Sequence, residues 1–372
     1  MKLNRLLLLL MASFCGYAQP DDVGLKDKIA QMLLVGFRGT ELTNDNPIYH
    51  AVKTLHIGGV ILFDYDVPSK SRPRNIQSSA QLTKLIAGLQ QLSPAPLWVA
   101  IDEEGGKVSR LKSTYGFPHT VSAKFQGMKD DTAITAFYAA QTAATLAALG
   151  VNLNFAPCVD IDVNPDCPII GKLERSFSID PDKVVKHAGI WIAEHTKQSV
   201  LTCPKHFPGH GSATHDTHAG SVDVTATWQE AELIPYRKLI ADNAVRLIMT
   251  SHVFNAHLDT TYPATFSKAI LTGLLREQLG FTGIILSDDL AMGAIARHYP
   301  LEEALEKAIN AGVDVLCLSN NGDAYDPHIA DKALNIIYRL VRTGKITPQR
   351  IDQSYQRILR IKNWKLPVED TN

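Results

Sequence analysis

One stretch of sixteen residues, KHFPGHGSATHDTHAG (205–220), carries many of the side chains in this chain that could do chemistry. It holds one aspartate and four histidines, which are His206, His210, His215 and His218. Imidazole exchanges protons near neutral pH and is also the commonest metal ligand in proteins. The stretch is therefore compatible with acid–base chemistry, with a metal site, or with a solvated surface loop.

Asp216 and His218 are two residues apart, which places their side chains on the same face of an extended loop. A carboxylate that accepts a hydrogen bond from an imidazole orients the ring and raises its basicity, as in many sites where histidine transfers protons. This pair is the part of the stretch that a solvated loop explains least.

A metal site is the main alternative. Spacings of three and four residues between histidines bind zinc when a helix holds the ligands. Pro208, Gly209 and Gly211 interrupt any helix here, and the chain has no Cys-x-x-Cys pair. We therefore expect neither a metal nor another cofactor, and a solvated loop accounts for His210 and His215.

A second cluster, GIILSDDLAMGA, places two aspartates after an apolar run, Gly283–Leu286, with one serine between. Neighbouring residues of a strand point to opposite sides, so one carboxylate enters a site at the strand end while the other does not. We assign Asp288 to the site. Asp289 then caps or braces the helix that is expected near Leu290.

Further polar clusters supply groups that bind a ligand. DEEGGKVSR contributes Asp102 and Arg110, ERSFS contributes Arg175, and Lys205 and His206 follow another apolar run. A guanidinium offers a fork of donors to hydroxyl and carbonyl oxygens, although a structural ion pair is an alternative for each arginine. This mixture of charges, with few phosphate-type glycine loops, suits a hydroxyl-rich ligand such as a sugar.

The apolar runs that precede these clusters recur eight times, with amphipathic segments between them. They are rich in Val, Ile and Leu without clean alternation, as expected of strands buried on both faces of a parallel sheet. The runs are Leu33–Phe37, Gly59–Phe63, Leu97–Ile101, Val151–Ala156, Val200–Cys203, Leu247–Thr250, Gly283–Leu286 and Val313–Leu318. Alternating strands and helices are typical of βαβ units, and eight of them fit one α/β domain, a TIM-type (β/α)8 barrel.

Polar clusters at the end of run after run favour the barrel, because barrel enzymes place their chemistry at the carboxyl ends of the strands. A doubly wound open sheet would concentrate such clusters at one switch point. We predict one catalytic barrel over residues 22–363, a tail over residues 364–372, and no second domain. The apolar helix expected over Thr132–Leu149 contains Thr and Gln, so we expect it to pack against the barrel.

The first 18 residues have the order of a secretory signal peptide. Two basic residues precede an apolar run, Leu6–Phe14, and small residues follow up to Ala18, where signal peptidase would cleave. The run is too short for a stable membrane span. Lipidation at Cys15 would require a small residue before it, where Phe14 stands. We therefore expect an exported protein, either periplasmic or secreted.

Composition and cysteine usage narrow the partners and the redox chemistry. The formal net charge is −1 and no basic tract occurs, which argues against nucleic acid. Hydrophobic residues make up 45% of the chain and charged ones 20%, as in an ordinary globular enzyme, and we expect a monomer. In an oxidising compartment Cys158 and Cys167 can form a disulfide, while Cys203 and Cys317 lie in apolar runs as buried thiols.

Taken together, these clusters resemble a known family. KHFPGHG, followed after four residues by DTH, is similar to the signature of family 3 glycoside hydrolases of the β-N-acetylglucosaminidase (NagZ-like) branch. DEEGGKVSR, NFAPCVDID, ERSFSIDP, MTSHV and SDDLAM resemble the other blocks of that family and stand in the same order. The resemblance covers residues 22–363.

The resemblance implies a single barrel-type domain and a retaining mechanism with a covalent glycosyl-enzyme intermediate. It implies Asp288 as the nucleophile and His218 as the acid/base, with Asp216 as the partner that orients His218. It further implies that the sugar is held by Asp102, Arg110, Arg175, Lys205 and His206. His252 and Asp160 also lie in family blocks, and neither receives a role.

The implied activity is that of an exo-acting β-N-acetylhexosaminidase (β-N-acetylglucosaminidase). Its substrates would be cell-wall fragments or chitin-type oligosaccharides. The best-known short members of this branch are cytoplasmic, so the signal peptide favours turnover of such chains outside the cytoplasm.

Alternatives to this activity stay open. A β-N-acetylglucosaminide phosphorylase would share the fold, because a histidine, unlike an aspartate, does not repel phosphate. A β-glucosidase would share it too, although that branch lacks the histidine motif. A metal-dependent hydrolase and a non-catalytic sugar-binding protein are alternatives of other classes.

Overall fold

The computed structural model describes residues 22–363, so the expected signal peptide and tail lie outside the described residues. The described chain forms eight short strands, each inside one of the eight expected apolar runs. They are β1 Leu33–Gly36, β2 Gly59–Ile61, β3 Trp98–Ile101, β4 Leu153–Asn154, β5 Leu201–Thr202, β6 Leu247–Met249, β7 Ile284–Leu286 and β8 Leu316–Leu318. Nearly all strand side chains are buried, which explains why the runs lack polar alternation.

Hydrogen bonds join the strands into a closed ring. Six strands pair in the order β5-β4-β3-β2-β1-β8, and β6 pairs with β7, all in parallel. Single parallel bridges close the two gaps: Phe207 pairs with Thr250 beyond β5 and β6, and Leu286 of β7 pairs with Val315 beside β8. The expected eight-stranded barrel is therefore confirmed.

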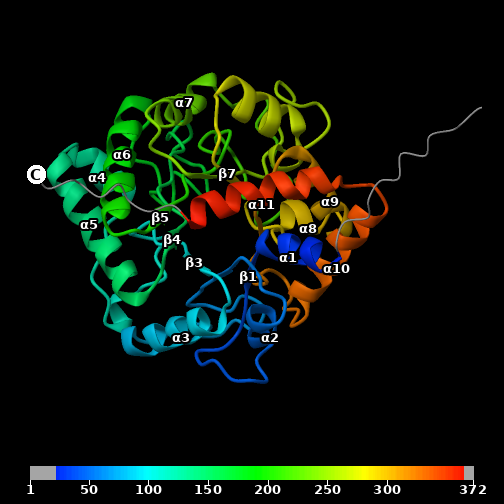
Figure 1. The fold of residues 1–372 in the computed structure, drawn as a ribbon. Coiled ribbons are helices and arrows are strands. Elements are labelled where there is room, and N and C mark those ends of the chain that lie inside the picture. Colours follow the sequence, from blue (N-terminus) through cyan, green and yellow to red (C-terminus); the bar gives the residue numbers. More distant parts are fainter. Residues whose placement is uncertain (1–21, 364–372) are drawn as a thin grey trace, which may run out of the picture.

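Helices surround the barrel (Figure 1). They are α1 Asp22–Gln31, α2 Pro47–Lys53, α3 Ser79–Leu92, α4 Ala123–Lys129, α5 Thr132–Leu149, α6 Pro181–Lys197, α7 Ile234–Ala241, α8 Gly293–Ala296, α9 Leu301–Ala311, α10 Ile329–Arg342 and α11 Pro348–Lys362. A π-helical segment, Ala269–Gln278, takes the place of the α-helix between β6 and β7. Short 3-10 turns occur at Ser113–Tyr115, Glu230–Leu233 and Ala264–Phe266.

Local sequence explains where several helices begin. Ser78, Asp180 and Thr347 each accept a hydrogen bond from a backbone N–H in the first turn of α3, α6 and α11, which stabilises these ends. Proline follows the cap in α6 and α11. A backbone N–H at this first helical position has no partner within the helix, so the missing N–H of proline costs no hydrogen bond. The apolar stripe of α11 is buried, as expected for a final packing helix.

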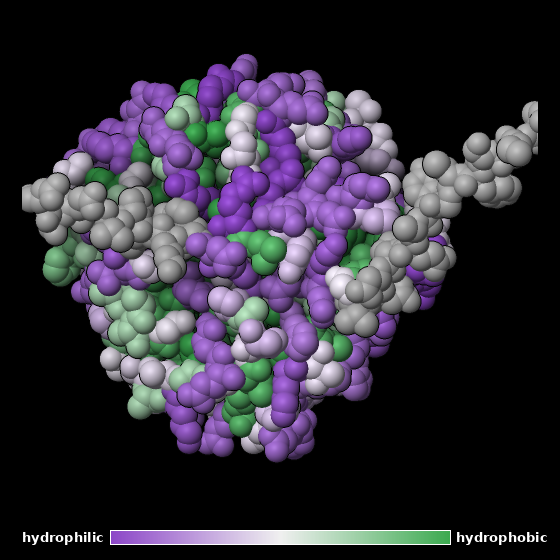
Figure 2. Space-filling view, in the orientation of Figure 1, coloured by the Kyte–Doolittle hydropathy of each residue, from purple (hydrophilic) through white to green (hydrophobic). Residues whose placement is uncertain are grey.

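The helices α11 and α1 lie side by side across the amino ends of the strands, where Lys28 of α1 pairs with Asp352 of α11 (Figure 1). Lys362 at the end of α11 donates to the carbonyl of Gly58, the residue before β2. Figure 2 shows that this face carries mainly hydrophilic side chains, with hydrophobic ones in separate groups. The carboxyl ends of the strands, where the polar clusters stand, lie at the opposite end of the barrel.

Among the described helices, α5 is the one that is long and apolar enough to cross a membrane by length and composition. It packs against α6 and α3 and buries Ala139, Thr142 and Leu146. A core helix of a globular protein meets the same criteria. The expectation that the chain has no stable membrane span therefore stays a prediction.

Candidate active site

A pocket of about 360 Å³ opens at the carboxyl ends of the strands. Seven of the eight predicted site residues line it, namely Asp102, Arg110, Arg175, Lys205, His206, His218 and Asp288. They come from the segments that follow β3, β4, β5 and β7. Segments so far apart in the chain meet because the closed ring brings all strand ends to one mouth.

Asp288 lies in this pocket, two residues after the end of β7. Its Oδ1 accepts the N–H of Asp289 at 2.8 Å, and its own N–H donates to Thr250 Oγ1 at 3.2 Å. Burial by itself would raise the pKa of this carboxyl, but the imidazoles of His252 and His206 outweigh burial and hold the pKa below its ordinary value. The side chain is therefore an ionised carboxylate at neutral pH, which is the state a nucleophile needs.

Asp289 binds the next strand end. Its Oδ1 accepts the N–H groups of Ser319, at 2.9 Å, and of Ala291, at 3.1 Å, and its Oδ2 accepts the Ser319 hydroxyl. These bonds tie the end of β7 to the end of β8. The helix expected near Leu290 begins only at Gly293, so Asp289 braces the strand ends and does not cap that helix.

His218 stands on the loop after β5 and pairs closely with Asp216. The ring Nδ1 donates to Asp216 Oδ1 at 2.7 Å. Burial would lower the pKa of His218, but the hydrogen bond and charge of Asp216 prevail and raise it. Because Asp216 occupies Nδ1, Nε2 is the nitrogen that can exchange a proton with a ligand. The carbonyls of Thr217 and His218 accept the N–H groups of Ala294 and Gly293, which fastens the loop to α8.

Lys205 is almost completely buried and bridges two carboxylates. Its Nζ lies 2.7 Å from Asp102 Oδ1 and 2.7 Å from Glu104 Oε1. Glu104 also forms a two-point ion pair with Arg175, with Nε–Oε2 and Nη2–Oε1 distances of 2.9 and 2.8 Å. Burial opposes the charge of Glu104, yet the Arg175 and Lys205 cations lower its pKa to about 2. Two cations and two anions thus form one ion network beside the pocket.

Arg175 and Arg110, the two arginines among the predicted site residues, differ in how many of their N–H donors already have a partner. Arg175 directs its guanidinium to Glu104 and to the carbonyl of Ile169, at 2.9 Å, so a structural ion pair describes it well. Arg110 makes one long contact, from Nη2 to Asp102 Oδ2 at 3.5 Å. Its buried Nε has no hydrogen-bond partner among the described residues. Arg110 therefore has donors available for a ligand in the pocket.

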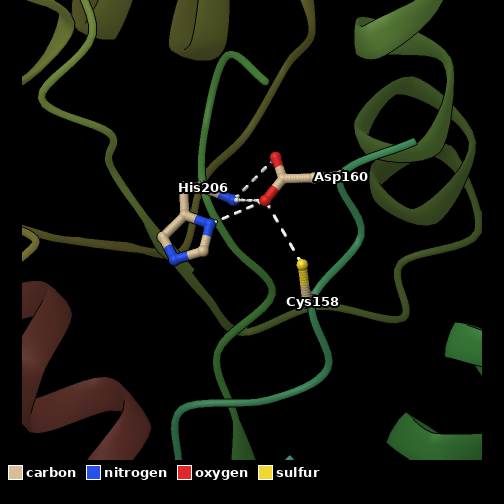
Figure 3. Close-up of side chains that lie close together, drawn as sticks. All are labelled: Cys158, Asp160 and His206. Atoms are coloured by element: carbon tan, nitrogen blue, oxygen red, sulfur yellow. Dashed lines mark hydrogen bonds and ion pairs between the residues drawn. The ribbon is translucent and has the colours of Figure 1, made fainter. Parts of the chain in front are cut away.

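His206, Asp160 and Cys158 lie together at the wall of the pocket (Figure 3). His206 Nδ1 donates to Asp160 Oδ2 at 2.7 Å, and the Cys158 thiol donates to the same oxygen at 3.3 Å. Arg175 Nη2 donates to His206 Nε2 at 3.1 Å, which places the proton of the ring on Nδ1. Asp160 thus orients His206, which lines the pocket.

The sulfur, oxygen and nitrogen atoms of these three side chains lie within 4.8 Å of one another. Among the described residues, this is the group that is close enough to share a metal ion. These atoms are already hydrogen-bonded, and Asp160 also accepts the backbone N–H groups of His206 and His210. Burial and the Asp160 charge raise the pKa of the Cys158 thiol, which disfavours the thiolate that binds metals. The arrangement is that of a hydrogen-bonded network rather than of a metal cage.

The family model described as the glycosyl hydrolase family 3 N-terminal domain matches residues 24–361. The chain belongs to this family. Among curated relatives, a β-hexosaminidase of Tolumonas auensis is 37% identical over 272 residues, which cover 71% of this chain and 76% of that protein. A β-hexosaminidase of Alkalilimnicola ehrlichii is 31% identical over 352 residues, which cover 90% of this chain and 94% of that protein.

Solved structures of family 3 show the same barrel. A β-N-acetylglucosaminidase from a Paenibacillus species matches with a TM-score of 0.82 and 31% identity, over 94% of this chain and 65% of that one. A β-N-acetylhexosaminidase from Beutenbergia cavernae matches with a TM-score of 0.78 and 28% identity, over 91% of this chain and 98% of that one. The resemblance drawn from the sequence blocks is confirmed.

The solvated-loop interpretation is wrong for His210 of this family 3 chain, whereas His215 is exposed as expected. The N–H of His210 donates to Asp160 Oδ1 at 2.9 Å, and its Nε2 lies 3.3 Å from Thr217 Oγ1. Burial lowers the pKa of His210 to about 4, so the ring is neutral. The loop folds back over the Asp160 carboxylate, and His210 links that carboxylate to the segment 216–218.

All four cysteines of the described residues are free, buried thiols, as the apolar runs around two of them predict. The disulfide that Cys158 and Cys167 could form is absent. The Cys158 thiol donates to Asp160, while the sulfur of Cys167 lies 3.7 Å from the carbonyl of His210. Each thiol therefore has its own acceptor.

The sequence pattern alone singles out neither Glu104 nor a role for Asp160. A signal for Glu104 exists, because it stands two residues after Asp102, and alternate residues of an extended segment share a face. Asp160 stands in the strand-end cluster NFAPCVDID beside Asp162. No local feature distinguishes these two aspartates, since the choice between them depends on where His206 lies.

Proposed function

We infer that this family 3 chain is a β-N-acetylhexosaminidase, an exo-acting glycoside hydrolase that releases terminal β-linked N-acetylglucosamine with retention of configuration. One observation carries the inference: an ionised carboxylate, Asp288, and a proton-exchanging imidazole, His218, line a single pocket. The relatives named β-hexosaminidase and β-N-acetylglucosaminidase support N-acetylglucosamine as the sugar.

In the first step Asp288 attacks the anomeric carbon while His218 Nε2–H protonates the leaving oxygen. The bond to the leaving group breaks as the ester between the sugar and Asp288 forms. Asp216 stabilises the imidazolium before the transfer and keeps the ring in the orientation that presents Nε2. Retaining glycosidases usually use two carboxyl groups, and here an imidazole fills the place of the acid.

In the second step the neutral His218 takes a proton from water. The oxygen of this water attacks the anomeric carbon, and Asp288 leaves as a carboxylate. One residue thus serves first as acid and then as base, in keeping with microscopic reversibility.

The sugar is held by polar side chains on the other side of the pocket. We assign its hydroxyl and amide groups to Asp102, Lys205, His206 and Arg110. The guanidinium of Arg110 makes one long contact to Asp102 and so keeps donors for such contacts. Arg175 contributes mainly by holding His206 and Glu104 in place, since its own donors are directed to these groups and to a backbone carbonyl.

A fluorinated N-acetylglucosamine analogue tests the nucleophile, because fluorine slows the second step and the sugar ester accumulates. Mapping the labelled peptide should place the ester on Asp288. A label on any other residue overturns the assignment, and a product that appears first as the α-anomer overturns retention.

The alternatives on the same fold are separated by their products. In phosphate buffer a hydrolase releases N-acetylglucosamine, whereas a phosphorylase releases its 1-phosphate. A β-glucosidase would cleave an aryl β-glucoside faster than the matching N-acetylglucosaminide. A metal-dependent hydrolase would lose activity on dialysis against a chelator, and a non-catalytic sugar-binding protein would bind without turnover. We expect free N-acetylglucosamine, the N-acetyl preference and full activity after chelation.

We further propose that the substrate is a cell-wall or chitin-type oligosaccharide outside the cytoplasm, and that the enzyme is a monomer. The order of charged, apolar and small residues in the first 18 positions supports export. Expression of the full chain, fractionation of the cells and sequencing of the mature N-terminus test this. An uncleaved cytoplasmic protein contradicts export, and light scattering during gel filtration tests the monomer.

A further inference from the structure

His252 belongs to the block MTSHV after β6 and is buried behind the nucleophile. It does not line the catalytic pocket but borders a second pocket, of about 300 Å³, whose walls include Asp223 and His298. A side chain in this place does not touch a sugar in the catalytic pocket. Any effect of His252 on the reaction therefore passes through other residues.

His252 joins the two backbone groups that flank the nucleophile. Its Nε2 donates to the carbonyl of Asp289 at 2.9 Å. Its Nδ1 lies 2.8 Å from Thr265 Oγ1, which in turn lies 2.7 Å from Thr250 Oγ1. Thr250 Oγ1 accepts the N–H of Asp288 at 3.2 Å. Hydrogen bonds thus run from the N–H of Asp288 to the carbonyl of Asp289 through three side chains.

The directions of these hydrogen bonds follow from the groups that can only accept. A carbonyl only accepts, so Nε2 of His252 carries the proton. Burial lowers the pKa of His252, and in the neutral ring Nδ1 is an acceptor. The Thr265 hydroxyl also donates to the carbonyl of Ser251 at 2.8 Å, and this carbonyl accepts the Thr265 N–H at 3.1 Å as well. The single Thr265 hydroxyl proton is therefore shared between the Ser251 carbonyl and Nδ1 of His252, both at 2.8 Å, and the Thr250 hydroxyl donates to Thr265.

We propose that His252 is a positioning residue that sets the orientation of the nucleophile through Thr265 and Thr250. This hydrogen-bonded network holds the segment Asp288–Asp289 at both ends. The Asp288 carboxylate therefore stays aimed at the anomeric carbon when it attacks and when it leaves. Misplacement of a reacting group by 1 Å costs about 100-fold in rate. The inference rests on the proposed function, because it assumes that Asp288 is the nucleophile.

Two pairs of variants test this role. His252→Ala and Thr265→Val break the chain, whereas His252→Gln keeps an amide donor and acceptor and Thr265→Ser keeps the hydroxyl. The broken variants should be labelled at Asp288 by the fluorinated analogue about 100-fold more slowly than the wild type. The conservative variants should keep most of the rate. KM and inhibition by free N-acetylglucosamine should change little in all four, since the sugar contacts are intact.

His187 provides a matched control. It is also buried, and its Nδ1 lies 2.7 Å from the hydroxyl of Thr135, but it stands on α6 outside the barrel. His187→Ala should lower the melting temperature and leave the labelling rate unchanged.

Labelling at the wild-type rate in the broken variants overturns the positioning role while the proposed function stands. A fall in melting temperature with an unchanged labelling rate overturns the positioning role equally. If the His252 variants do not fold, the comparison of Thr265→Val with Thr265→Ser tests the role instead. A wild-type protein that the analogue labels elsewhere than Asp288 overturns the proposed nucleophile and the positioning role together.

Discussion

Both the ring Nδ1 and the backbone N–H of His218 donate to one oxygen of Asp216, at 2.7 and 2.8 Å. One carboxylate thereby holds the backbone and the side chain of His218 together. The orientation of the ring and its affinity for a proton depend on the same partner, so removing Asp216 should affect both.

Asp216→Asn should narrow the pH range of activity. Attack requires ionised Asp288 and protonated His218, and against the effect of burial the pKa of Asp288 is lowered while that of His218 is raised. Activity should therefore persist at mildly acidic pH and fall as pH rises through the raised pKa of His218. Without the Asp216 charge that pKa drops, so the alkaline limb of kcat/KM should move to lower pH. An alkaline limb that does not move contradicts the pairing.

His218→Ala should act according to the leaving group. A leaving oxygen of high basicity needs a proton in the first step, and general acid catalysis contributes about 10²–10⁴-fold. An activated aryl oxide leaves without protonation, so its glycoside should form the sugar ester at a rate much closer to that of the wild type. Pre-steady-state release of the leaving group from both substrate classes measures this step. Equal losses for both classes would show that His218 is not the acid.

Glu104→Gln should destabilise the protein strongly. The change removes a buried carboxylate shared by Lys205 and Arg175, and breaking a buried ion pair costs about 3–5 kcal/mol. KM should rise as well, because Lys205 loses the partner that positions it. Glu174→Gln is the matched control, since Glu174 pairs with Lys107 on the surface, where such pairs contribute little. Equal free energies of unfolding for the two variants would contradict the network.

Glu103→Gln should change how stability depends on pH. Burial raises the pKa of Glu103 from an ordinary value of 4.5 to about 7, although its Oε2 accepts the N–H groups of Arg110 and Leu111. Between pH 4.5 and about 7 the Glu103 carboxyl binds a proton in the folded protein more than in the unfolded one, so the free energy of unfolding falls as pH rises. The glutamine does not titrate. The stability of the variant relative to the wild type should therefore increase from pH 4.5 to about 7 and then level off.

Urea unfolding at a series of pH values measures this difference. A difference that stays constant with pH would contradict the raised pKa of Glu103.

The barrel and the position of Asp288 could be predicted from sequence because both depend on local pattern. Runs of Val, Ile and Leu without alternation indicate strands buried on both faces, and each of the eight contains one strand. A polar residue within two positions of the end of such a strand lies at the mouth of a closed barrel. The pairing of Asp216 with His218 could be predicted for the same reason, since residues two positions apart in an extended segment place their side chains on one face.

His210 shows where local pattern fails. Glycine, proline and histidine in one loop indicate exposure, yet His210 is buried because the loop folds over the Asp160 carboxylate. The separate thiols of Cys158 and Cys167 are a similar case, since the Cys158 thiol donates to the nearby Asp160 carboxylate and the Cys167 sulfur lies near the carbonyl of His210, 43 positions away.

The sequence by itself determined the eight strands, the barrel and the order of reactive side chains around its mouth. Tertiary structure decided which carboxylate meets which cation or imidazole: Glu104 meets Arg175 across 71 positions, and Asp160 meets His206 across 46. It also decided that His252 reaches the carbonyl of Asp289. The physical reason is that strand periodicity fixes the direction of a side chain, while these distances arise only when the ring of strands closes.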